Sequence, residues 1–420
     1  MKIEIPYGEG LLDCEIPDSR LKGVLRPQGG SAKADGIALV KKAMANPIGS
    51  ERLEVLCKGK KRILLIASDH TRPVPSWAII PPMMEEIRAG SPDAQVKVLI
   101  ATGFHRAATP EELQAKFGDL YKELDIEMHD ARDPSSMVFK GLLPSGGELW
   151  LNRLVDWADL IVSEGFIEPH FFAGFSGGRK SILPGIASQT TVFANHCAKF
   201  IAGPRSRTGV LDGNPIHEDM VFAAKTAGLR YIVNVTIDSQ KQVLSAYAGD
   251  PFEAHAAGCD YVMAHAAVTR IPCDIVITSN GGYPLDQNIY QAVKSMTAAE
   301  SCVRPGGVII ICAACIDGHG GEDFYNWFAR GEDAETVQRR ILAIEQMQTL
   351  PDQWQAQILA RVLCHAKVIL VCEPCARQFA EDMGMLCAPD LASALEMADG
   401  LTNGGDIVAI PDGVGVIVRD

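Results

Sequence analysis

The chain has 420 residues, 47% of them hydrophobic, which is enough to bury a large core and favours two or more domains. It carries 39 Lys and Arg against 52 Asp and Glu, a formal charge of −13, so its overall field repels nucleic acid and argues against a nucleic-acid partner. No apolar run reaches the roughly 18 residues of a membrane span, and the first residues lack the pattern of a secretory signal. We therefore expect a cytoplasmic protein with no membrane partner.

Short apolar runs that end in small or polar residues recur along the chain and alternate with helix-like spacers. Because these runs are apolar throughout, they are typical of parallel strands that are covered on both faces. The sequence predicts an α/β fold with two doubly wound, mostly parallel sheets and an active site in the cleft between two domains. The predicted strands begin near residues 62, 96, 160, 274, 307 and 367.

Helical periodicity marks the spacers between these strands. We expect Ser76 to cap a helix that runs to about Arg88, with two prolines, Pro81 and Pro82, in its first turn or at a kink. Further helices are expected over residues 190–200, 216–228, 251–267, 287–301 and 333–348. A new strand after the long Ala-rich helix suggests an N-terminal α/β domain of residues 1–268 and a C-terminal α/β domain of residues 269–420.

The turn after the first apolar run, "SDHTRPVP", places a guanidinium at a strand end. Arg72 precedes Pro73, which disfavours a helical backbone at that point. Such an arginine is suited to bind a carboxylate or a phosphate, and a surface salt bridge is an equally good interpretation.

Histidines follow two of the predicted strands, His105 in "ATGFHR" and His170 in "FIEPH". Neighbouring strand ends meet at one edge of a doubly wound sheet, so the two imidazoles can face a common cleft. Two imidazoles across a cleft can act as a general base and a general acid near neutral pH. A third, His196, lies in the next helix-like segment, although a single histidine in such a place is more often structural.

The segment "EPHFFAGFSGGRKSILPG" combines flexible glycines with basic residues. Gly177 and Gly178 let the backbone approach a ligand, and Arg179, Lys180 and Ser181 supply donors, so a bound phosphate is a plausible interpretation. The frame departs from the phosphate-binding loop of nucleotide hydrolases, and a plain glycine turn with solvated basic residues stays an alternative.

The second half of the chain offers weaker signals. Cys-x-x-Cys pairs at residues 312–315 and 372–375 can hold zinc, but each ends a strand-like run, where free buried cysteine is common. Gln291 and Lys294 share one face of a predicted helix and, taken alone, are typical of a solvated surface.

Taken together and in this order, the segments resemble the nickel-dependent lactate racemase family. The resemblance is carried by "SDHTRPVP", "ATGFHR", "EPHFFAGFSGGRKSILPG", "FANH", "YQAVK" and "DQW". It implies a racemase or epimerase of a small-molecule 2-hydroxy acid that works by reversible hydride transfer to a nickel pincer nucleotide, a pyridinium-3,5-bisthiocarboxylate mononucleotide. It also implies transient contact with the enzymes that make this cofactor.

The resemblance further implies a role for each matching residue. Lys180 would anchor the cofactor covalently, His196 would bind nickel, and His105 and His170 would be the acid and base on opposite sides of the substrate. The remaining matches divide into a substrate-binding set, Arg72, Gln291 and Lys294, and a set along the ribose and phosphate, Asp69, Gly177 and Gly178. The family pattern "ATGTHR" has threonine where this chain has Phe104, so the substrate is expected to be lactate or a larger analogue.

Two other functional classes stay open from the sequence. The slipped glycine loop allows a nucleotide hydrolase of the phosphate-binding-loop type. The cysteine pairs allow a non-catalytic protein that binds a nucleotide or a metal.

Overall fold

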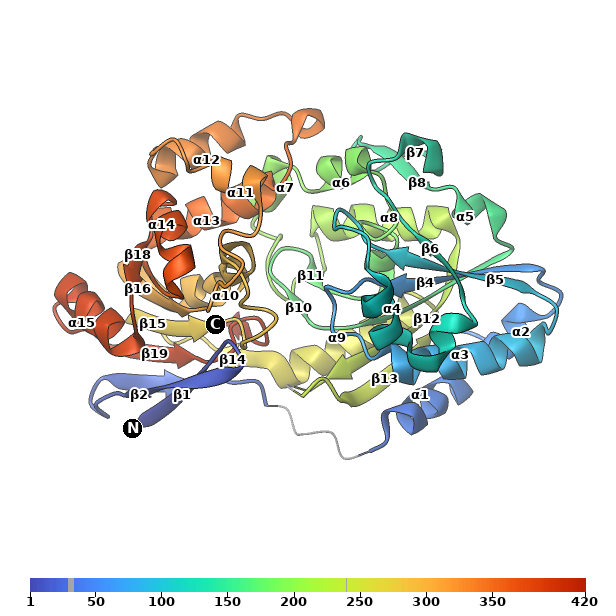
Figure 1. The fold of residues 1–420 in the computed structure, drawn as a ribbon, viewed down its shortest axis with the longest axis horizontal. Coiled ribbons are helices and arrows are strands. Elements are labelled where there is room, and N and C mark those ends of the chain that lie inside the picture. Colours follow the sequence, from blue (N-terminus) through green and yellow to red (C-terminus); the bar gives the residue numbers. More distant parts are fainter. Residues whose placement is uncertain (29–33, 239) are drawn as a thin grey trace.

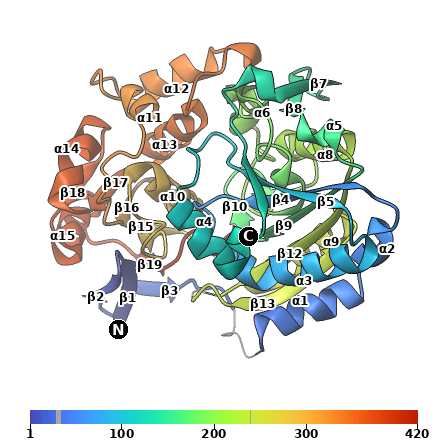
Figure 2. The same cartoon turned by 45° about the vertical axis from the view of Figure 1, so that its right-hand side comes forward.

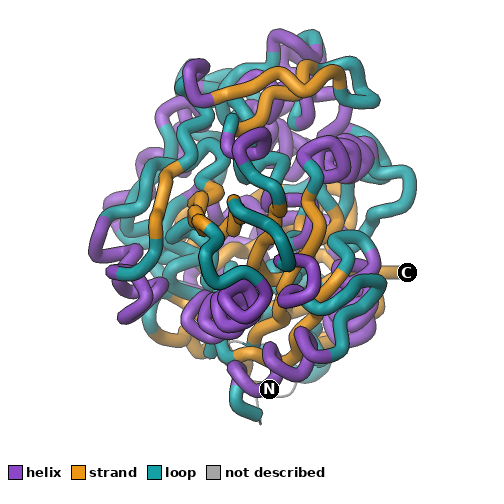
Figure 3. The backbone as a smooth tube through the Cα atoms, turned by 90° about the vertical axis from the view of Figure 1, so that its right-hand side faces the viewer, coloured by secondary structure: helices purple, strands orange, loops and turns teal. Residues whose placement is uncertain are grey.

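The predicted apolar runs form central strands of two six-stranded sheets, each the framework of one lobe (Figure 1). The coordinates are a computed structural model that describes residues 1–28, 34–238 and 240–420. Helices cover the sheets and most strands lie inside (Figure 3). The prediction of an α/β fold with two mostly parallel sheets is therefore confirmed.

The first sheet has the strand order β13-β12-β9-β4-β5-β6, and every neighbouring pair is parallel except β12 with β13. Successive side chains of its strands enter different cores, because Leu64 and Ile66 pack into one cluster and Ile63 and Leu65 into another. Both faces are thus buried, which explains the uninterrupted apolar sequence. The strands are β4 (Arg62–Ser68), β5 (Gln95–Ala101), β6 (Asp125–Met128), β9 (Leu160–Phe166), β12 (Leu229–Ile237) and β13 (Val243–Gly249).

Helices from the first lobe supply the two covering layers. One core contains side chains of α1 (Gly36–Ala45), α2 (Leu53–Cys57), α3 (Ser76–Gly90) and α4 (Pro110–Phe117). The other contains side chains of α5 (Leu154–Trp157), α6 (Gln189–Asn195), α7 (Ala198–Ala202) and α8 (Pro215–Ala227). Helix α9 (Glu253–Ala266) leads toward the second lobe (Figure 2).

The second sheet has the order β18-β17-β16-β15-β19-β3 and is parallel throughout. Its strands are β3 (Leu21–Val24), β15 (Cys273–Ser279), β16 (Val303–Cys312), β17 (Lys367–Val371), β18 (Leu386–Ala388) and β19 (Ile407–Ile410). One face carries α10 (Ile289–Cys302), α11 (Glu322–Asn326), α12 (Ala334–Leu342), α13 (Gln353–His365) and α14 (Pro374–Asp382). The other carries α15 (Leu391–Thr402) and the hairpin of β1 (Lys2–Tyr7) and β2 (Gly10–Glu15).

The N-terminal strands lie in the lobe of the C-terminal sequence. Strand β3 pairs in parallel with β19, and the β1–β2 hairpin packs beneath the same sheet (Figure 1). The chain therefore crosses between the lobes before β4 as well as after α9. The domain boundary at residue 268 stays a prediction. The first 24 residues, which that boundary assigns to the N-terminal domain, lie in the second lobe.

Each sheet has a point where the strand order reverses, which is where open α/β sheets bind ligands. In the first sheet this point lies between β4 and β9, and in the second between β15 and β19. The polar residues predicted at the strand ends therefore cluster where a ligand is expected.

Short elements complete the lobes. These are the hairpin of β7 (Met137–Leu142) and β8 (Glu148–Asn152), the two-residue pair β10 (Pro169–His170) and β11 (Gly174–Phe175), the parallel pair β14 (Ala267–Thr269) and β20 (Ile417–Arg419), and the 3-10 turns η1 (Gly118–Lys122), η2 (Pro134–Ser136), η3 (Gly178–Ser181) and η4 (Gln346–Gln348). Across the described ranges, no helix combines the length and the apolar character needed to cross a membrane.

Two predicted helices differ from the structure in ways that affect the site. Ser76 is the first residue of α3 instead of its cap, and Pro81 lies beyond the first turn. The single helix expected over residues 190–200 is interrupted, because Cys197 adopts an extended conformation and His196 ends α6. This interruption leaves His196 at a helix end, where its ring can turn toward the space between the lobes.

Candidate active site

A cavity of about 930 Å³ lies between the lobes, with residues of both among its lining. All of the residues singled out from the sequence as site candidates contribute to it. They are Asp69, Arg72, His105, His170, Gly177, Gly178, Lys180, His196, Gln291 and Lys294.

His105 is held by a buried carboxylate. Its Nδ1 lies 2.7 Å from Asp69 Oδ2 and 3.2 Å from the hydroxyl of Thr71. Asp69 is 2% exposed, and burial alone would raise its pKa, but hydrogen bonds from His105 and Thr71 together with the charge of Arg72 lower the pKa to about 2. Asp69 therefore stays ionised and fixes the orientation of an imidazole that is 43% exposed to the cavity.

His170 and Lys180 both belong to the glycine-rich segment of the first lobe, and their side chains contact each other. Lys180 Nζ lies 3.1 Å from His170 Nε2, and the amide of Ala173 donates to His170 Nδ1 at 3.2 Å. Because Nδ1 accepts, the neutral ring carries its proton on Nε2. Burial lowers the pKa of both groups well below their usual values, and the nearby cation Arg72 adds to this effect. Both shifts favour the neutral forms, a nucleophilic amine and an uncharged imidazole.

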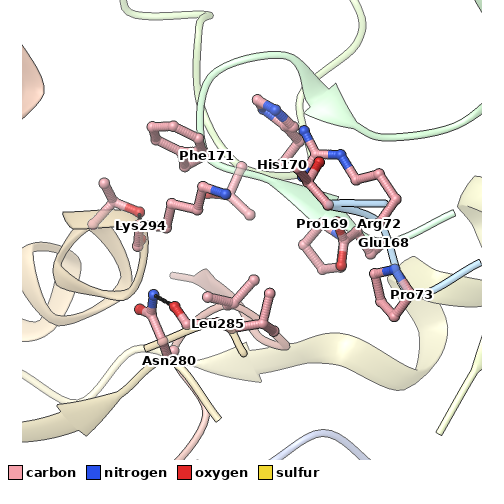
Figure 4. Close-up of a pocket in the computed structure, with 14 residues that line it drawn as sticks. Arg72, Pro73, Glu168, Pro169, His170, Phe171, Asn280, Leu285 and Lys294 are labelled. Atoms are coloured by element: carbon pink, nitrogen blue, oxygen red, sulfur yellow. Dashed lines mark hydrogen bonds between the residues drawn. The ribbon is translucent and has the colours of Figure 1, made fainter. Parts of the chain in front are cut away.

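A smaller cavity of about 30 Å³ joins the two lobes beside His170 (Figure 4). Arg72 and Glu168 reach it from the first lobe, and Lys294 reaches it from α10 of the second lobe. Burial raises the pKa of Glu168, with the two cations opposing, and burial together with Arg72 lowers the pKa of Lys294. Two cations against one carboxylate make this corner attractive to a small anion.

Several residues that line the cavity carry a buried polar atom without a partner. His196 Nδ1 and Gln291 Oε1 are buried and have no hydrogen bond within the described part of the chain. The His196 ring packs edge-on against Phe172 and Trp354, with centroids 5.1 and 5.2 Å away. Burial lowers the pKa of His196 to about 3, so the ring is neutral and keeps a lone pair for a metal.

The glycine loop is tightly packed against the protein. A Cβ on Gly177 would lie 2.8 Å from the carbonyl oxygen of Phe166, and one on Gly178 would lie 2.8 Å from the ring of His255. Both glycines also have positive φ angles, 77° and 53°, so a side chain at either position would be strained.

Arg179 does not contribute a donor to the cavity, so the prediction that it contacts a ligand is wrong. Its side chain turns inward and donates to the carbonyl oxygens of Ala173, Phe175 and Gly177. The reason is local: the loop doubles back at β10 and β11 and turns several carbonyls toward the same buried point, and a guanidinium can donate to several at once. Arg179 is thus a structural residue of the loop.

The structure gives little support to the two alternative functions, a nucleotide hydrolase and a non-catalytic protein that binds a nucleotide or a metal. A phosphate-binding loop leads into a long helix, whereas η3 is a four-residue 3-10 turn. Across the described residues, no group of three or more His, Cys, Asp or Glu side chains is arranged to hold a metal ion. Cys312 is buried, and the thiol of Cys375 contacts the backbone carbonyls of Cys315 and Ile316 at 3.8 Å.

Sequence reasoning missed two carboxylates of the site, Glu164 and Glu168. Glu164 lies inside β9, and an acidic residue within the apolar run "LIVSEGF" was the available signal, because a buried charge needs a reason. Glu168 is the first residue of the glycine-rich segment, and the histidine, glycines and lysine that follow it gave the stronger signals.

Phe104, the aromatic residue beside His105, lines the cavity. Its ring packs edge-on against Phe193 with centroids 5.4 Å apart, and the guanidinium of Arg132 lies 3.8 Å from its centroid. Phe193 in turn contacts Trp354. The aromatic side chain is therefore one end of a packed row that leads toward His196.

The fold and the site together define a two-lobed α/β enzyme whose basic and imidazole groups converge on an interlobe cleft. The family profile described as lactate racemase N-terminal domain matches residues 7–209, and that described as lactate racemase C-terminal domain matches residues 268–418. The chain belongs to the lactate racemase family and is an isomerase.

Individual relatives agree along the whole length. The chain is 54% identical to the lactate racemase of Thermoanaerobacterium thermosaccharolyticum, covering 100% of this chain and 99% of the relative. It is 48% identical to the lactate racemase of Lactiplantibacillus plantarum, covering 99% of each. The structure of the T. thermosaccharolyticum apoprotein matches with a TM-score of 0.97, covering 100% of both chains. A Thermotoga maritima protein with 18% identity and a TM-score of 0.65, covering 91% of this chain and 97% of its own, shares the fold.

Proposed function

We propose that the protein racemises lactate, by reversible hydride transfer to a nickel pincer nucleotide joined to Lys180. The observation that carries the proposal is the convergence of all ten candidate residues on one interlobe cavity. Relatives that are 54% and 48% identical and are named lactate racemase support lactate as the substrate. We further propose a cytoplasmic location and transient contact with the enzymes that make the cofactor.

The residues present suit this cofactor. Burial favours the neutral form of the Lys180 amine, which acylation of an amine requires, and Gly177 and Gly178 border the same cavity without side chains, which would let a nucleotide come close to the backbone. The neutral ring of His196 lines the cavity, and an imidazole suits nickel that is otherwise bound by sulfur and carbon. When bound, the cofactor would accept a hydrogen with its electron pair from the substrate Cα and return it to either face.

The chain's own residues would bind and orient the substrate. The carboxylate of a 2-hydroxy acid is the small anion expected between Arg72 and Lys294, since these cations border the same small cavity. Gln291 borders the larger cavity and carries an amide that could bond a polar group of the substrate. Anchoring one end of the substrate leaves its Cα a limited set of positions between the two imidazoles.

Two histidines would manage the hydroxyl proton. One imidazole would take the proton from the hydroxyl of one enantiomer, and the other would return a proton when the opposite enantiomer forms. His170 is neutral with its proton on Nε2 and would be the proton donor, and Asp69 would stabilise the positive charge that His105 gains when it takes the hydroxyl proton. Asp69 is thus proposed as a positioning residue for His105, not as a ribose ligand.

The proposal is tested on protein produced together with the cofactor pathway. Intact mass should show an adduct that Lys180→Ala lacks, and metal analysis should show nickel that His196→Ala loses. The loaded protein should interconvert D- and L-lactate without taking up solvent deuterium at Cα. His105→Ala and His170→Ala should each reduce turnover by about 100-fold or more.

Several outcomes would contradict parts of the proposal. An equal adduct on Lys180→Ala would remove the covalent anchor, and undiminished nickel in His196→Ala would remove the proposed ligand. Near wild-type turnover in either histidine variant would remove the two-base scheme. A panel of chiral 2-hydroxy acids decides whether lactate or a larger analogue is preferred.

A further inference from the structure

His196 lies at a break between two helices of the first lobe that pack against the second lobe. The break consists of residues 196–197: helix α6 ends directly before His196, and Cys197 is extended before α7 begins. Helix α6 lies against η4, and α7 lies against α12 and α13, all of the second lobe (Figure 1). The imidazole of His196 lines the cavity of about 930 Å³. Its position therefore depends on how the break is held.

Two glutamines of the second lobe bond to the backbone on either side of the break. Gln346 Nε2, in η4, donates to the carbonyl oxygen of Ala194 at 3.1 Å. Gln357 Nε2, in α13, donates to the carbonyl oxygen of Ala198 at 2.9 Å. Gln357 is 3% exposed, so its bond is shielded from water. The second lobe thus holds the backbone both before and after His196.

The backbone at the end of α6 needs such donors. The last carbonyls of a helix have no intrahelical partner, and Ala194 belongs to the last turn of α6. From the first lobe, Asn195 Nδ2 donates to the carbonyl oxygen of Ile216 at 3.2 Å and to Asp219 Oδ2 at 3.3 Å. Hydrogen bonds from opposite sides therefore fix the break between α8 and the second lobe.

The ring of His196 is also contacted by the second lobe. The indole of Trp354, in α13, lies edge-on to the imidazole with centroids 5.2 Å apart. Its Nε1 donates to the hydroxyl of Tyr290 at 3.2 Å, which holds the indole in place. Backbone bonds and ring contacts together place the imidazole before a metal binds, and a ligand that is already in place binds without a further cost of ordering.

We propose that Gln346 and Gln357 are positioning residues for His196, and that through them the second lobe determines how firmly the imidazole holds nickel. This inference rests on the proposed function, since it needs nickel on His196. Both amides bond to backbone carbonyls, so neither glutamine acts as a metal ligand itself. Removal of groups that orient a metal ligand typically weakens metal binding by about 10- to 100-fold.

Gln346→Met and Gln357→Met each remove one amide and keep the length of the side chain. Protein loaded with the cofactor is mixed with excess EDTA well below its unfolding temperature, and the nickel left on the chain is followed by metal analysis. We expect each variant to lose nickel about tenfold faster than wild type. The mass added at Lys180 should stay as in wild type, because Lys180 lies in η3, outside the break. Gln348→Met, at an exposed glutamine of the same 3-10 turn as Gln346, should lose nickel like wild type.

The absorption spectrum of the bound nickel separates positioning from a general loss of stability. It should change in Gln346→Met and Gln357→Met before any chelator is added, because the imidazole is part of the metal's coordination sphere. It should not change in Gln348→Met. If Gln357→Met does not fold, as judged by thermal melting of the apoprotein, Gln346→Met decides alone, since Gln346 is only half-buried.

The outcomes separate the two proposals. Absence of nickel from the loaded wild-type protein, or undiminished nickel in His196→Ala, would refute the proposed function whatever the glutamines do. Nickel loss at the wild-type rate from both Gln346→Met and Gln357→Met would overturn the role of the glutamines. Equally fast loss from Gln348→Met, or loss of the mass at Lys180 together with the nickel, would overturn it as well.

Discussion

The buried guanidinium of Arg179 gives a quantitative test of how the loop that carries His170 and Lys180 is held. Arg179 is 1% exposed, and its donors reach the carbonyl oxygens of Ala173 at 2.7 Å, Phe175 at 2.7 Å and Gly177 at 3.3 Å. Arg179→Met keeps an unbranched side chain of similar length but removes every donor. The perturbation therefore removes three hydrogen bonds from a charged donor, although Ala173 O and Gly177 O each keep a bond from a backbone amide.

The magnitude follows from two opposing contributions. The loss of three hydrogen bonds from a charged donor, at about 2 kcal/mol each, costs about 6 kcal/mol. Burial lowers the pKa of Arg179 from 12.5 to about 10, so about 3 kcal/mol of desolvation is recovered when the charge is removed. We expect a net loss of about 3 kcal/mol, which for a protein of this size is a fall in Tm of roughly 3–4 °C.

Thermal and urea unfolding of the apoprotein measure this loss. The control is Arg62→Met, which removes a surface ion pair with Asp159 worth at most about 1 kcal/mol. In loaded Arg179→Met protein that remains folded, turnover should also fall, because the segment bearing His170 is no longer fixed to the core. A Tm within 2 °C of wild type, or a change no larger than that of Arg62→Met, would refute the assignment of Arg179 as the residue that holds the loop.

Three further changes test other parts of the site. Asp69→Asn should lower kcat by about 100-fold or more with a smaller change in KM, because His105 loses its carboxylate; unchanged steady-state kinetics of the loaded variant would contradict this. Burial lowers the pKa of His129 to about 4 from 6.5, so the unfolded chain binds an extra proton between these values, and stability should be complete above pH 6.5 and fall by about 3 kcal/mol toward pH 4. His129→Gln should flatten this dependence in urea titrations, and equal slopes for both proteins would exclude the effect. Phe104→Thr should raise kcat/KM for 2-hydroxybutyrate relative to lactate by roughly tenfold, because the cavity widens beside His105; an unchanged ratio would show that Phe104 does not limit substrate size.

Much of the fold could be predicted from local sequence. The strands β4, β5, β9, β15, β16 and β17 were expected because uninterrupted apolar runs are needed where both faces of a sheet are covered. The candidate residues could be found for a related reason: parallel strands present their ends at one edge, and polar residues directly after an apolar run must lie there. The glycine loop was visible because two adjacent glycines and a lysine are uncommon between apolar segments.

The direction of individual side chains was decided only by the tertiary structure. Arg179 and Lys180 are neighbours in sequence, yet one turns into the core to bond three carbonyls and the other reaches the cavity. Ser76 was expected to cap a helix and instead donates to Glu164, a residue 88 positions away. The sequence by itself determined which elements form and which segments border the cleft, since periodicity and turn chemistry are local. Packing between distant segments determined which polar side chains are paired inside the protein and which reach the cavity.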